Sequence, residues 1–149
     1  MFNLTLQAMQ NFIIKTHKAD TMYLGEHFYI LCKGKNSGKP LMQPCANCWV
    51  LQFRNKQEFE NYYWMAYTLW QSKFWHYFLV GSVIPFLRLF EFKKEFFPKT
   101  EMLQADYELH LKNVMALQLL QQKEQEFKKK LNLIADMRKA ILYRYVNHQ

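Results

Sequence analysis

The chain has 149 residues, of which 50% are hydrophobic, 17% aromatic and 21% charged. This balance is typical of one globular domain and excludes a disordered or low-complexity chain. Only four glycines are present, so most glycine-rich nucleotide-binding loops are excluded as well. The 20 Lys and Arg residues against 12 Asp and Glu give a net charge of +8, which favours an anionic partner, either nucleic acid or an acidic protein surface.

Three cysteines are too few for a secreted disulfide scaffold, and the first residues do not have the pattern of a signal peptide. We therefore expect a cytoplasmic protein. The longest apolar run, residues 74–87, includes His76 and Pro85 and is shorter than the roughly 20 residues of a membrane-spanning helix. The sequence thus predicts no membrane span.

Residues 1–54 have the short runs that predict strands and turns. Residues 12–14 are either a strand or the end of a helix that begins near Phe2. Stronger strands are expected at residues 27–33 and 49–54, and in the second of these Trp49, Leu51 and Phe53 would share one face. Turn-forming residues between the two strands predict a hairpin with a long loop.

A helical period begins at Asn55, which together with Glu58 predicts a capping box. Aromatic residues then recur every three or four positions and predict one continuous helical stripe that ends near Gly81; they are Phe59, Tyr63, Tyr67, Trp70, Phe74 and Phe78. Because 15 of the 26 aromatic residues lie between residues 57 and 98, this part is expected to be the core or a surface for a partner.

A second helix is expected over residues 83–97, with Ser82 as its N-cap, Pro85 in its first turn and Pro98 at its end. From Thr100 to Val146, no Gly or Pro interrupts a helix-favouring sequence. Apolar residues in this part occupy the a and d positions of one heptad frame, in which Glu124 and Arg138 fill the remaining positions; they are Leu117, Leu120, Phe127, Leu131, Ile134, Ile141 and Tyr145.

One helix over residues 100–146 would be about 70 Å long, which exceeds a compact domain of this size. Either it bends back near residues 121–126, which we favour, or it pairs with another helix. In the second case Leu120, Phe127, Ile134 and Ile141 would form the seam.

These elements together predict an α+β fold in a single domain. We expect residues 1–54 to form a small antiparallel sheet and hairpin, packed against the aromatic-rich helices of residues 55–97. A long or bent C-terminal helix would follow at residues 100–146.

Cys45 and Cys48 form a C-x-x-C motif, which occurs in zinc knuckles and in redox pairs. Cys32 would be a third zinc ligand if the two strands pair. His27 is a poor fourth ligand, because an odd spacing from Cys32 places it on the opposite face of a strand. Since no fourth ligand is evident, we expect ordinary buried cysteines and no cofactor, with zinc as the alternative.

Residues 34–40 superficially resemble a P-loop, but the glycine spacing is too short and Pro40 stands where a Ser or Thr would reach magnesium. We interpret the segment as a mobile loop whose Lys33, Lys35 and Lys39, together with Arg54, contact phosphates without reading bases. A solvated hairpin tip is the alternative. No catalytic constellation can be assembled, so we do not expect an enzyme.

The run from His27 to Leu41, the Pro44–Cys48 segment and residues 81–86 resemble a family of short uncharacterised proteins of Bacteroidetes and their mobile elements and phages. The resemblance covers roughly residues 15–90. It implies a bacterial cytoplasmic or phage setting, and no activity.

The sequence therefore predicts a non-enzymatic basic binding protein of unknown role that contacts nucleic acid through its Lys-rich loop. The alternative is a protein–protein adaptor, or a structural or accessory protein of a phage or mobile element, whose C-terminal helix pairs with itself or with a partner.

Overall fold

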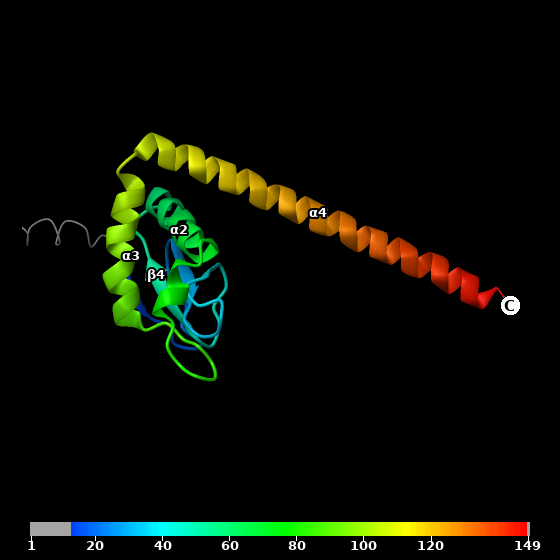
Figure 1. The fold of residues 1–149 in the computed structure, drawn as a ribbon, viewed down its shortest axis with the longest axis horizontal. Coiled ribbons are helices and arrows are strands. Elements are labelled where there is room, and N and C mark those ends of the chain that lie inside the picture. Colours follow the sequence, from blue (N-terminus) through cyan, green and yellow to red (C-terminus); the bar gives the residue numbers. More distant parts are fainter. Residues whose placement is uncertain (1–12, 149) are drawn as a thin grey trace, which may run out of the picture. The chain divides into compact units, whose positions relative to one another are not determined.

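The computed structural model describes residues 13–148 and confirms the α+β fold (Figure 1). The described residues divide into two compact units, the first ending at Tyr107 and the second beginning at Glu108. The elements are β1 (Ile13–Thr16), β2 (His27–Leu31), β3 (Pro40–Leu41), β4 (Cys48–Gln52), α2 (Lys56–Gln71), the 3₁₀ helix η1 (Phe74–Phe78), α3 (Leu89–Gln104) and α4 (Tyr107–Asn147). The alternative helix from Phe2 to Phe12 lies outside the described residues.

The four strands form one antiparallel sheet in the order β1-β4-β2-β3. Both strongly predicted strands are confirmed, and they pair with Leu31 opposite Cys48 and Phe28 opposite Leu51. Alternation along the strands gives the sheet two different faces. Trp49, Leu51 and Phe53 share one face, as their spacing predicts, and this face is here named the first face.

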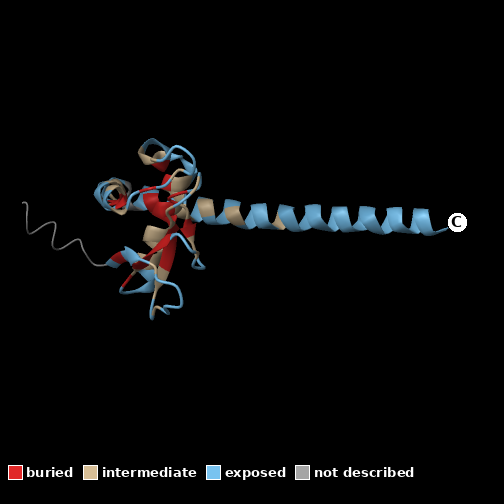
Figure 2. Cartoon of the chain, turned by 90° about the horizontal axis from the view of Figure 1, so that it is seen from below, coloured by how far each residue is buried: buried red, intermediate tan, exposed pale blue. Residues whose placement is uncertain are grey.

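The first face of the sheet carries the core, and the aromatic residues supply most of it. Side chains of α2, η1 and α3 pack against this face, and Figure 2 shows the buried residues gathered there. The ring of Phe92 lies 4.9 Å from that of Trp75, 4.8 Å from that of Phe96 and 5.2 Å from that of Trp49. Of the two roles expected for the aromatic region, it mainly forms the core.

Loop residues and Leu41 of β3, rather than helices, cover the second face. Tyr29, Cys48 and Val50 are buried there beneath Tyr23, Leu41 and Cys45. Four rings, those of His17, Tyr23, His27 and Tyr29, pack side by side with centroid separations of 5.2 to 6.2 Å. Both sheet faces are therefore occupied, one by helices and the other by residues of the connecting loops and of β3.

The cap of α2 follows the predicted pattern in part. The Asn55 side chain accepts a hydrogen bond from the backbone N–H of Glu58 at 2.9 Å. The Glu58 carboxylate, however, accepts from the backbone N–H and the guanidinium of Arg54, at 3.3 and 2.9 Å. The capping residue, Asn55, is thus as predicted. In a complete capping box Glu58 would accept from the backbone N–H of Asn55, but here it accepts from that of Arg54.

The predicted continuous aromatic helix is wrong beyond Gln71. Lys73 has a φ of 59°, a left-handed conformation that a continuing helix cannot contain, and the rings from Phe74 to Phe78 belong to the separate η1. The local ring spacing was compatible with one helix, but the turn at Lys73 redirects the chain so that Trp75 is buried in the core.

The predicted second helix over residues 83–97 is also wrong, because α3 spans Leu89–Gln104 and contains Pro98. Val80 and Phe86 instead exchange backbone hydrogen bonds of 3.0 and 2.9 Å across the short loop of residues 81–85. Leu87 also donates its N–H to the carbonyl of Cys32 at 2.9 Å. The pairing of residues 85–87 with residues 32–34, far away in the sequence, uses backbone groups that a helix would have needed, and it overrides the local helix-start signals.

The second unit consists of α4, which is continuous from Tyr107 to Asn147. The predicted bend near residues 121–126 is therefore wrong. Two ion pairs within the helix support this polar stretch, Lys123 with Glu126 at 3.0 Å and Lys128 with Glu124 at 3.1 Å. Gln, Lys and Glu also have high helix propensity, so the stretch gives no reason to break. Among the described residues, no helix is long and apolar enough to span a membrane.

Candidate functional site

The Lys-rich segment, residues 33–39, is here named the cation loop. Ser37 and Gly38 of this loop are buried, whereas Lys33, Lys35 and Asn36 are exposed. Ser37 is 1% exposed and donates its hydroxyl to the carbonyl of Gly34 at 2.7 Å. Gly38 is also buried, with a φ of +94°, and lies directly against the Trp75 ring. The loop is therefore anchored by two small residues that carry no charge.

The four predicted phosphate-binding cations do not form one group. Lys33 and Lys35 are exposed on the cation loop. The Lys39 ammonium lies 4.9 Å from the centroid of the Trp70 ring, a cation–π contact with the end of α2. Arg54 follows β4, beside the start of β2, whereas the cation loop follows the end of β2. Lys33 and Lys35 are thus exposed on one loop, and Arg54, ion-paired with Glu58, lies at the other end of the strand pair.

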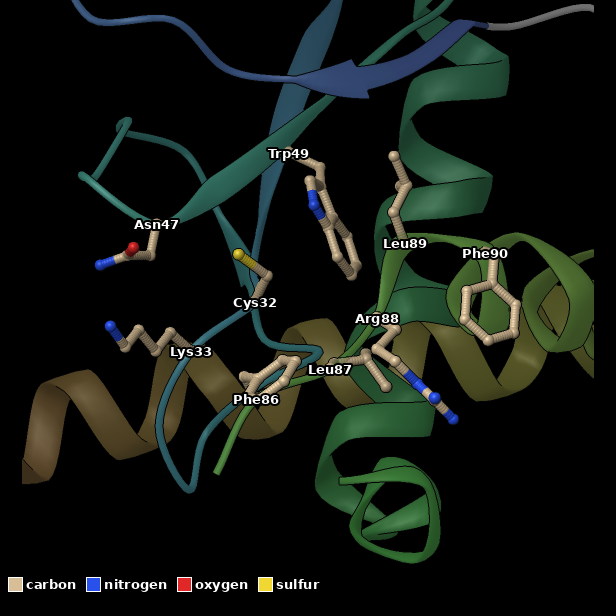
Figure 3. Close-up of a pocket in the computed structure, with 9 residues that line it drawn as sticks. All are labelled: Cys32, Lys33, Asn47, Trp49, Phe86, Leu87, Arg88, Leu89 and Phe90. Atoms are coloured by element: carbon tan, nitrogen blue, oxygen red, sulfur yellow. The ribbon is translucent and has the colours of Figure 1, made fainter. Parts of the chain in front are cut away.

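A pocket of about 490 Å³, here named the Cys32 pocket, lies beside the start of the cation loop (Figure 3). Backbone pairing assembles it, because Cys32 donates its N–H to Asn47 at 3.0 Å and accepts from Leu87 at 2.9 Å. Its lining residues come from three segments and are Cys32, Lys33, Asn47, Trp49 and the five residues from Phe86 to Phe90.

The Cys32 pocket is lined mainly by apolar side chains, with the basic Lys33 and Arg88 at its sides. Trp49 and Leu87 are almost fully buried, while Phe86 and Phe90 are 41% and 61% exposed. Figure 3 shows Lys33 on one side and Arg88 on the other. The Arg88 guanidinium lies 4.7 Å from the centroid of the Phe90 ring and pairs with Glu91 at 2.6 Å. Sequence reasoning found Cys32 and Lys33 but missed Phe86 and Arg88, since no local signal links residue 33 to residue 86.

The three cysteines lie on different faces of the sheet. Cys32 packs against the first face, whereas Cys45 and Cys48 belong to the second. The Cys48 thiol donates to the carbonyl of Cys45 at 3.1 Å and accepts from the backbone N–H of Cys45 at 3.4 Å. His27 lies on the same face as Tyr29, away from Cys32 as expected. Within residues 13–148, no three His, Cys, Asp or Glu side chains come together in a way that could hold a metal ion.

Burial controls the chemistry of these thiols. It raises the pKa of Cys48 to about 11, and it raises the pKa of Cys32 with a smaller contribution from Cys45. Both thiols are therefore protonated at neutral pH, which makes them weak nucleophiles. The arrangement suits cysteines that fill space in a core.

The predicted seam of α4 is exposed along its length. Leu120, Phe127, Ile134 and Ile141 are 65%, 59%, 52% and 64% exposed, respectively. They lie at the d positions of the heptad frame, and the exposed Leu131 and Tyr145 lie at the a positions beside them. A single helix cannot bury its own side chains, so this apolar seam, named the α4 seam, can be covered only by another element.

The fold defines the chain as an α+β protein in which a small sheet with an aromatic core is followed by one long helix. It belongs to DUF6943, a family of unknown function, whose model matches residues 14–144. The match confirms the resemblance to an uncharacterised family and extends it from about residue 90 through most of α4. No curated protein and no solved structure matches the chain.

Proposed function

We propose that the protein is a non-enzymatic association module that pairs with another helix through the α4 seam, in the simplest case with that of a second copy. The observation that supports this proposal is the exposure of all four d-position residues, each above half. Monomeric proteins rarely expose large apolar residues in a continuous stripe. In proteins, most of the stability of a helix comes from packing of its apolar face against another element. A bacterial cytoplasmic or phage setting belongs to the same proposal.

Two adjacent residues of α4 provide a matched test. Ile134 lies in the α4 seam and is 52% exposed, whereas Leu133 lies at a c position outside it and is 62% exposed. Burying a Leu or Ile side chain in a helix pair stabilises the pair by roughly 1.5–3 kcal/mol. Because a pair of two copies contains the residue twice, a substitution removes this stabilisation twice. Ile134→Ser should therefore weaken association about tenfold or more, and Leu133→Ser should have little effect.

Sedimentation velocity of the full chain over a wide concentration range measures this association directly. We expect a mass above that of a monomer for the natural sequence and for Leu133→Ser. Ile134→Ser should be monomeric at concentrations at which the natural chain is still associated. A strict monomer at high concentration, or equal effects of the two substitutions, would contradict the proposal. Circular dichroism of both variants checks that α4 still forms.

Anion binding by the cation loop is a second candidate function, in line with the predicted contact with nucleic acid. It is supported by Lys33 and Lys35, which are exposed and form no ion pair among residues 13–148. Fluorescence anisotropy with double-stranded DNA and single-stranded RNA over a salt series tests it. Lys33→Ala with Lys35→Ala should reduce the salt slope by about two units, because each phosphate contact contributes about 0.9.

Arg54→Ala is the control for this second candidate, because Arg54 is remote from the loop. Its slope should match that of the natural chain. Absence of binding to any nucleic acid at low salt would refute the candidate, and a loss per removed charge that is the same for Arg54→Ala as for the loop variant would show that the effect is one of net charge rather than of the loop.

A further inference from the structure

We infer that the α4 seam pairs with the same seam of a second copy, and that the two helices run antiparallel. The inference rests on the proposed association through α4 and adds the identity and the direction of the partner helix. Its basis is the placement of charge within an otherwise apolar seam: Glu124 and Arg138 occupy a positions, between the apolar residues Leu120, Phe127, Leu131, Ile134 and Ile141.

A parallel pair in register would place like charges together inside the seam. In that arrangement each a residue faces the same residue of the second chain. Glu124 would face the partner's Glu124, and Arg138 would face the partner's Arg138. At the edges, a g residue faces the e residue of the next heptad, so Lys123 would also face the partner's Lys128 on both sides. The parallel pair therefore has two like-charged layers and two like-charged edge contacts.

An antiparallel pair removes the like-charged layers. In that arrangement each a residue faces a d residue of the second chain. One alignment places Leu131 opposite the partner's Ile134 at the centre of the pair. Glu124 then faces the partner's Ile141, and Phe127 faces the partner's Arg138, where a guanidinium can lie over the ring.

The same alignment also joins opposite charges. Glu124 and the partner's Arg138 lie on the same flank of the antiparallel pair, and they are offset by three residues, or about 4.5 Å along the axis. By symmetry this contact occurs twice. Lys123 with the partner's Arg144 is a like-charged edge contact that also occurs twice, so the edges disfavour the two directions equally and the like-charged layers decide between them. Charge complementarity therefore favours the antiparallel pair.

Engineered cysteines in the full chain distinguish the two directions. Position 120 lies opposite the partner's position 120 in the parallel pair. In the antiparallel pair it lies opposite the partner's position 145, so the two copies of position 120 are 25 residues, or about 37 Å, apart. Disulfides need Cα atoms within about 7 Å. Leu120→Cys alone should therefore not cross-link under mild oxidation, whereas a mixture of Leu120→Cys and Tyr145→Cys chains should.

The natural chain is the control for cross-linking through the three natural cysteines. Gln122→Cys, at a position that faces away from the α4 seam, is the control for chance collisions. Non-reducing electrophoresis reads the result. Cross-linking of Leu120→Cys with itself would overturn the antiparallel direction while leaving association through α4 intact. A chain that sediments as a monomer would overturn both, so the two failures are distinguishable.

Charge exchange gives a second, independent readout. Arg138→Glu should raise the dimer dissociation constant about tenfold or more, because two opposite-charge contacts become like-charge contacts. Adding Glu124→Arg restores both contacts in the antiparallel pair, so the double variant should return to within about threefold of the natural chain. In a parallel pair the double variant still has one Glu–Glu layer and one Arg–Arg layer, so it gains no opposite-charge contact. If the double variant did not regain the affinity that Arg138→Glu loses, the antiparallel direction would be contradicted.

Discussion

Gly38 offers a sharp test of how the cation loop is held. An alanine at this position would need a φ of +94°, and its Cβ would lie 2.1 Å from Cδ1 of the buried Trp75 ring. The loop or the ring would have to move, since both belong to the packed core. We therefore expect Gly38→Ala to destabilise the first unit strongly.

The magnitude has two parts. A left-handed backbone costs a residue with a Cβ about 1–2 kcal/mol, and forcing an extra carbon into a packed core typically costs about 1–3 kcal/mol. Together they amount to about 2–5 kcal/mol, a large part of the roughly 5–15 kcal/mol by which a domain is stable. For a unit of about 100 residues the melting temperature should fall by about 10 °C or more.

Gly34→Ala is the matched control, because Gly34 lies in the same loop with a φ of +96° but has no described atom within 4 Å of the added Cβ. It should show the backbone cost alone. Urea denaturation followed by tryptophan fluorescence measures both variants. Equal destabilisation by the two substitutions would refute the conclusion that the Trp75 contact anchors the loop.

Phe96 is fully buried, so Phe96→Ala should lower the free energy of unfolding by about 3–5 kcal/mol, as measured by urea denaturation. Phe90 is 61% exposed, so Phe90→Ala should lower it by less than about 1 kcal/mol. Asn55→Ala should cost about 1 kcal/mol by removing the acceptor for the first turn of α2, and Asn55→Asp should restore most of it. With its pKa raised from 9.0 to about 11, Cys48 should be alkylated about 100-fold more slowly at pH 8 than in the unfolded chain, as followed by peptide mass spectrometry. The same shift means that folding favours the neutral thiol, so the unfolding free energy should fall as pH rises from about 9 to about 11; a flat profile there would contradict the burial of this thiol.

The parts of the fold that were predictable depend on contacts between near neighbours in sequence. Alternation alone placed Trp49, Leu51 and Phe53 on one face, because each strand residue points opposite to the next. Asn55 was recognisable as a helix cap because its acceptor bonds a backbone N–H only three residues away. Such signals do not require knowledge of the rest of the chain.

The errors arose where distant segments decide the local structure. Ser82 and Pro85 are good helix starters, yet residues 85–87 are extended because they pair with residues 32–34. The sequence predicts that a helix ends at Pro98, yet Pro98 lies within α3. The expected bend in α4 came from the assumption that a domain must be compact, whereas its sequence has no helix breaker.

The candidate site divides in the same way. Cys32 and Lys33 stood out in the sequence, but the pocket they line also requires Phe86 and Arg88, which reach it only through strand-like pairing. Arg54 was grouped with the loop lysines by charge alone, and the register of β2 and β4 separates them. The positions of the α4 seam follow from the heptad spacing, which needs no tertiary information.

The edges of the small sheet also bear on how the protein behaves when concentrated. An open strand edge invites strands of other molecules and leads to aggregation. One edge here, β3, has two residues, including Pro40, which lacks an N–H to donate. On the other edge, β1 carries the exposed Lys15, whose charge opposes the approach of another strand. Assembly by strand addition is thus disfavoured at both edges, and complexes of this protein should dissociate on dilution rather than grow into fibres.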